Sequence, residues 1–109
     1  MAFDEQLAER VRKQLGRRAG LSEKKMFGGI GFLINGNVSC GVHGRELIVR
    51  IAPETTGAAL QEPGARIFDL TGRPMKGWLF VGGAGIKAPA ALARWVLRGV
   101  TYASSLPKK

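Results

Sequence analysis

Cysteine and histidine are almost absent from this chain of 109 residues, which contains one of each, Cys40 and His43. A lone cysteine cannot form an internal disulfide, and structural zinc sites need several ligands drawn mainly from these two residue types. We therefore expect no structural metal site and no cofactor. Residues 38–43 alternate with period two, which places Cys40 and His43 on opposite faces of one strand and argues against a Cys-His nucleophile pair. We expect Cys40 to be a small buried apolar residue, with a reactive thiol as the alternative.

Long apolar runs are also missing. No stretch approaches the roughly 18 consecutive apolar residues that a membrane-spanning helix needs. The first residues, MAFDEQLAERV, contain early acidic side chains and no apolar segment of signal-peptide length. We expect a cytoplasmic protein that does not associate with membranes.

Acidic residues are scarce, with 8 Asp and Glu against 17 Lys and Arg, and the formal net charge is +9. Such a charge creates a positive field that attracts anionic partners and weakens as salt rises. An acidic protein surface and nucleic acid both fit this charge, and so does a solvated basic surface without a specific partner. The few acids are scattered and no histidine stands near them, so we expect no enzymatic activity.

The segment KKMFGGIGFLING, residues 24–36, contains four glycines and has two interpretations. A phosphate-binding loop would need Gly36 to be followed by lysine and then serine or threonine, and neither stands there. A dinucleotide fingerprint starting at Gly29 would need a third glycine at Ile34. Extended strands explain the segment better, because Asn35-Gly36 is the dipeptide that most readily forms a tight hairpin turn. We predict an antiparallel meander in which the glycines mark the turns.

Helical patterns occur at both ends of the chain. Apolar residues at every fourth position predict a helix over residues 3–17, and a second periodic stretch predicts a helix over residues 88–105. Between them, Pro53 and the pair Pro63-Gly64 indicate the start and the end of a short middle helix.

The remaining periodic segments predict strands before residue 35 and over residues 38–43, 46–52, 65–70 and 78–83. Residues 71–77, TGRPMKG, are predicted to form a tight loop. The pattern therefore predicts an α+β fold in which an antiparallel sheet of about five to six strands is packed against N-terminal, middle and C-terminal helices. At this length we expect a single domain over residues 1–109.

Four separated stretches are similar, in the same order and spacing, to the N-terminal domain of the TfoX/Sxy competence regulators. They are KKMFGGIGFLINGN (24–37), LIVRIAPE (47–54), EPGARIFDLTGRPMKGW (62–78) and WVLRGVTYASSLPKK (95–109). The resemblance implies a two-layer α+β domain and a role in regulating DNA-uptake genes together with a transcription factor, without catalysis. It supplies no catalytic residues. Family members carry a second, C-terminal helical domain, and since this chain ends at Lys109 we expect a stand-alone N-terminal domain.

The loop TGRPMKGW, residues 71–78, is the first candidate binding site. It presents Arg73 and Lys76 with Trp78 behind them, a mixture suited to a phosphate or to an acidic protein segment. The alternative is that Pro74 and the glycines shape a turn while Trp78 packs into the core.

A second candidate is the outward face of the C-terminal helix. Arg94 and Arg98 project from it, and they would form one basic patch with Lys108 and Lys109 if the tail folds near them. A solvated helix face is the alternative.

We therefore interpret the chain as a non-enzymatic regulatory or adaptor domain that binds an acidic protein of the transcription machinery. The competing hypothesis is a nucleic-acid-binding protein that contacts phosphates without strong sequence specificity. An exposed edge strand of the meander also offers a route to a homodimer.

Overall fold

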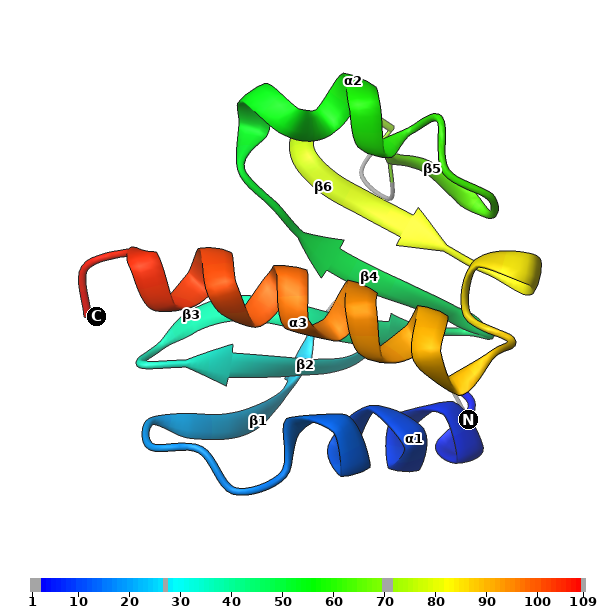
Figure 1. The fold of residues 1–109 in the computed structure, drawn as a ribbon. Coiled ribbons are helices and arrows are strands. Elements are labelled where there is room, and N and C mark those ends of the chain that lie inside the picture. The colour runs from blue at the N-terminus through cyan, green and yellow to red at the C-terminus, as the bar shows by residue number, and fades with distance from the viewer. Residues whose placement is uncertain (1–2, 27, 70–71, 109) are drawn as a thin grey trace.

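The computed structural model describes residues 3–26, 28–69 and 72–108. The element order is α1 (Glu5–Leu15), β1 (Leu21–Met26), β2 (Gly29–Ile34), β3 (Asn37–His43), β4 (Glu46–Arg50), η1 (Pro53–Thr55), α2 (Thr56–Ala59), β5 (Ala65–Phe68), β6 (Met75–Val81), η2 (Gly83–Gly85) and α3 (Pro89–Ser105). The strands form one six-stranded antiparallel sheet in the order β1-β2-β3-β4-β6-β5. Helices α1 and α3 lie side by side on one face of it (Figure 1). The predicted α+β fold is confirmed.

Helix α1 begins two residues later than its apolar spacing predicts. The Asp4 side chain accepts hydrogen bonds from the backbone N–H groups of Gln6 (2.8 Å) and Leu7 (3.3 Å), which makes Asp4 the N-cap. Phe3 therefore lies outside the helix, where it forms an isolated bridge with Gly44. The apolar spacing identified the buried stripe of the helix, and the cap decides its first residue.

The glycine-rich segment folds as strands. Asn35 and Gly36 both adopt positive φ (52° and 83°) in the hairpin turn between β2 and β3, as predicted. However, Gly29 and Gly31 lie inside β2 and do not mark turns; a Cβ at Gly31 would stand 2.3 Å from the sulfur of Met26. Since β2 pairs with both β1 and β3, its backbone is engaged in the sheet and is not arranged as a phosphate loop.

The strands differ most from the sequence prediction at β1 and at the start of β6. β1 has the sequence LSEKKM, whose polar residues give no strand signal; it is an edge strand that is held by its pairing with β2. β6 begins at Met75, so Lys76 and Gly77 belong to a strand and not to the predicted loop. Gly77 takes a φ of 84°, and its N–H donates to Thr56 Oγ1 (2.8 Å), which ties the start of β6 to α2.

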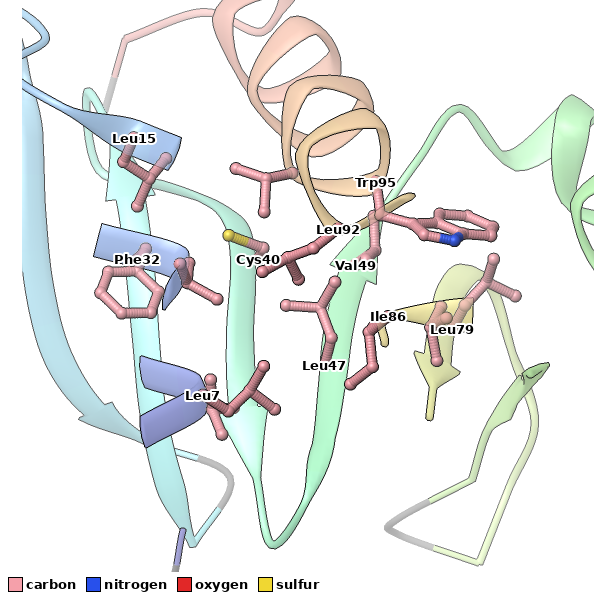
Figure 2. Packing of buried hydrophobic residues seen from close by; sticks show 14 of the residues in the cluster. Leu7, Leu15, Phe32, Cys40, Leu47, Val49, Leu79, Ile86, Leu92 and Trp95 are labelled. Carbon is pink, nitrogen blue, oxygen red and sulfur yellow. The ribbon is translucent and has the colours of Figure 1, made fainter. Parts of the chain in front are cut away.

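The main core lies between the sheet and the two long helices (Figure 2). Trp95 and Leu92 of α3 pack over Val49 and Leu79 of the sheet, and all four are buried. The residues of α3 that were predicted to dock on the sheet are all buried: Leu92, Trp95, Val96, Val100 and Ala103. Gly99 allows the closest approach, since a Cβ there would stand 2.2 Å from the carbonyl oxygen of Ser39 in β3.

A second, smaller apolar cluster lies on strands β4, β5 and β6. Ile48, Phe68 and Phe80 are its buried members, and the partly buried Met75 and Trp78 pack against it. The alternation along β4 places Ile48 on the sheet face opposite Leu47 and Val49, which belong to the main core. Trp78 therefore packs on the face of the sheet that lies away from α3.

Candidate partner-binding surface

Internal salt bridges use most of the acidic side chains. Six of the eight acids take part, in three clusters: Arg12 with Glu5, Glu9 and Glu23; Arg66 with Glu46 and Asp69; and Glu62 with Arg94 and Arg98. A seventh acid, Asp4, caps α1. Within the described ranges, every other lysine and arginine is without a salt bridge, so these side chains supply the positive surface field.

The candidate loop brings two of these cations to the surface. Arg73 lies in the turn before β6 and Lys76 lies within that strand, and both are exposed. The Thr71 end of the loop lies outside the described residues. Trp78 is half-buried, with its ring centroid 5.8 Å from that of Phe68. The tryptophan thus packs against the small cluster on β4, β5 and β6 and is not part of the main core.

Arg50 links this region to helix α3. It ends β4 directly opposite Trp78 of β6, and its guanidinium carbon lies 5.2 Å from the Trp78 ring centroid and 5.5 Å from the ring centroid of Tyr102 in α3. We call these three residues the Arg50 clamp. In the part of the chain that the structure describes, the Arg50 guanidinium has neither a salt bridge nor a hydrogen-bond acceptor, so its N–H donors are unused there.

A groove of about 420 Å³ lies beside the clamp, between α3 and the chain that leaves β4. We call it the Leu97 groove; it is lined by Ile51, Ala52 and Thr55 on one side and by Leu97, Arg98, Thr101, Tyr102 and Ser105 on the other. Leu97 is 55% exposed, the one large hydrophobic side chain in the described ranges that is exposed. Because Tyr102 belongs to both features, the clamp and the groove adjoin one another.

The two arginines predicted on α3 are not free cations. Glu62 accepts hydrogen bonds from Arg94 (3.4 Å) and from Arg98 (2.6 Å), and the Arg98 guanidinium also lies 4.3 Å from the Trp95 ring centroid. Glu62 therefore neutralises part of the charge that the sequence places on this face. Arg98 still forms part of the wall of the Leu97 groove.

The segment that follows α3 is held against the sheet. The Asn37 side-chain amide donates to the carbonyl of Pro107 (2.9 Å), which holds the segment after α3 against the start of β3. Lys108, exposed, follows this anchor, while Lys109 lies outside the described residues. Helical rise alone separates Arg98 from the end of α3 at Ser105 by about 10 Å. Lys108 therefore lies beyond the end of α3, next to the segment that Asn37 holds, and its membership of one patch with Arg94 and Arg98 stays a prediction.

Cys40 and His43 diverge, as predicted. Cys40 is fully buried in the main core, and burial raises the pKa of its thiol to about 12, so the thiol stays protonated at neutral pH. The ring of His43 instead lies 5.8 Å from that of Phe80, in the cluster on the other face. The prediction that Cys40 is a small buried apolar residue is confirmed.

Sequence reasoning missed Arg50, Leu97 and Tyr102. A signal for Arg50 was present, since an arginine within the apolar run LIVRIA needs a special environment. Leu97 gave none, because a leucine within a periodic helix is ordinarily a core residue.

The edges of the sheet are β1 and β5. β1 carries two exposed lysines, Lys24 and Lys25, a common means of discouraging edge-to-edge pairing. Self-association through an edge strand stays a prediction. No helix in the described ranges combines the length and the apolar character that crossing a membrane requires.

Comparison with known families gives one match. A family model described as the TfoX N-terminal domain matches residues 13–103, which is most of the chain and includes the sheet, the Arg50 clamp and the groove wall on α3 except Ser105. No curated protein and no solved structure matches this chain.

Proposed function

This chain belongs to the TfoX N-terminal domain family, and we propose that it is a non-enzymatic regulatory domain that binds an acidic protein of the transcription machinery. The family is a regulatory one, and this supports the class of function. The binding mode is supported by the charge distribution.

One observation carries the proposal. The acids of the chain are largely engaged in internal salt bridges, whereas exposed cations such as Arg73 and Lys76 have no carboxylate partner within the described ranges. An acidic surface would find these cations available without first breaking an intramolecular pair. Electrostatic complementarity of this kind speeds association and selects among partners.

A pull-down from a bacterial lysate, with the full chain as bait, tests the proposal. The variant is R73E/K76E, and its matched control is K24E/K25E, which changes the net charge equally on the edge strand β1, separated from β6 by three strands. We expect the first variant to reduce capture of a transcription protein at least tenfold and the control to leave most of it. Unchanged capture by R73E/K76E would count against this site.

Phosphate contact with nucleic acid is the competing function, and the same uncompensated cations favour it. The two functions differ in their salt dependence. Binding to random duplex DNA through phosphates falls steeply with salt, with a slope close to the number of phosphates neutralised. A titration of the full chain with random duplex DNA from about 50 to 200 mM salt separates them. Tight, steeply salt-dependent binding together with nuclease-sensitive capture would favour nucleic acid over a protein partner.

A further inference from the structure

Arg50 occupies an unusual position for a cation. It lies at the end of a buried strand, half-buried, with aromatic rings of Trp78 and Tyr102 near its guanidinium and no acceptor among the described residues. Stacking of this kind holds the planar guanidinium in one orientation while its edge N–H groups remain available. Because contacts with two rings restrict the side chain, less conformational entropy is lost when an oxyanion binds to it.

The Leu97 groove adds an apolar element next to this cation. Ile51, the neighbour of Arg50 in sequence, lines the groove together with Ala52 and the exposed Leu97. A leucine that is 55% exposed on a helix otherwise docked on the core gains free energy when a partner covers it. Tryptophan, tyrosine and arginine, the three residue types of the clamp, are also those most enriched where binding energy concentrates in protein interfaces.

We propose that the Leu97 groove and the Arg50 clamp bind an amphipathic helical segment of a partner protein. An apolar side chain of that segment enters the groove beside Leu97, and an aspartate or glutamate nearby on the same helix forms a bidentate pair with Arg50. This rests on the proposed function and names the docking site for the acidic partner. A protein segment is favoured because the groove is open along α3 and the chain carries a net charge of +9, with six of its eight acids already in salt bridges.

A selection of random 16-residue peptides displayed on phage, against the immobilised full chain, provides the test. We expect enriched peptides to combine an acidic residue with apolar residues at helical spacing. Their affinity should fall at least tenfold in both Leu97→Ser and Arg50→Met. Arg45→Met, which removes an exposed arginine from the β3–β4 turn, is the matched control and should change affinity less than twofold.

The outcomes are separable. Acidic peptides that depend on Arg73 and Lys76 but tolerate Leu97→Ser and Arg50→Met would overturn the groove and leave the proposed function standing. Enrichment of peptides without acidic residues would contradict both. Concentration-dependent self-association of the chain that Leu97→Ser abolishes, measured by sedimentation, would assign the groove to a second copy and overturn the proposal. Thermal unfolding of each variant verifies that the compared chains are folded.

Discussion

Arg50 and Trp78 are opposite one another on the neighbouring strands β4 and β6, with the guanidinium carbon 5.2 Å from the ring centroid. The two residues are 28 positions apart in the chain, and their contact joins the candidate loop to the strand that leads into the Leu97 groove. A cation over an indole is favourable by about 0.5–1 kcal/mol where it is partly exposed. The contact therefore orders a surface feature more than it stabilises the fold.

Removing the arginine should expose the indole. We expect Arg50→Ala to make Trp78 more accessible to acrylamide, while Trp95, fully buried, stays protected. The loss of stability should be on the order of 1 kcal/mol, since only a half-buried contact is lost. Fluorescence quenching and urea unfolding measure the two effects. Unchanged quenching would show that Arg50 does not cover the ring in solution.

Two glycine-to-alanine changes should have opposite effects. Gly99→Ala would place a Cβ 2.2 Å from the Ser39 carbonyl, so we expect α3 to shift and the free energy of unfolding to fall by roughly 1–3 kcal/mol. Gly57→Ala in α2 meets no atom within 4 Å and should stabilise the chain by up to about 1 kcal/mol. Urea denaturation compares the pair. Equal effects would mean that Gly99 is not a packing requirement.

Cys40 should make stability depend on pH in the alkaline range. Burial raises the pKa of its thiol from 9.0 to about 12, so above pH 9 the unfolded chain loses a proton that the folded chain keeps. This contribution is complete below pH 9 and declines as pH rises toward 12, by at most about 1.4 kcal/mol per pH unit. Melting temperatures from pH 7.5 to 10.5 measure the decline. In Cys40→Ala the part due to the thiol should vanish; identical slopes in both chains would contradict the assignment.

Glu62 should weaken the attraction of α3 for nucleic acid, because it neutralises part of the charge of Arg94 and Arg98. Glu62→Gln frees Arg94 and Arg98, and it should cost no more than about 1 kcal/mol because these pairs are partly exposed. We expect random duplex DNA to bind the variant more tightly, with a salt slope steeper by about one or two phosphates. Glu54→Gln makes the same change in charge at a residue without a salt bridge in the described ranges and should have a smaller effect. Equal binding by the two variants would show that the freed arginines do not contact DNA.

Comparison of α1 and β1 shows where pattern reasoning succeeds. The buried face of α1 could be predicted because its apolar residues repeat with the helical period and all face one core. β1 shows mainly polar side chains and owes its conformation to hydrogen bonds with β2, so its own residues contain little information about it. In the candidate loop, Arg73 and Lys76 are exposed, but the sequence did not predict that Lys76 lies within a strand.

The chain's own sequence was sufficient to establish the α+β class, the hairpin at Asn35-Gly36, the buried face of α3 and the excess of positive charge, because each follows from local periodicity, turn chemistry or composition. Only the tertiary structure decided that Glu62 neutralises Arg94 and Arg98, and that Arg50 lies near two aromatic rings beside an open groove. Those contacts join residues that are tens of positions apart. A pattern along the chain reports which side chains are present and which face they share, whereas the distance between two distant charges is fixed by how the elements pack.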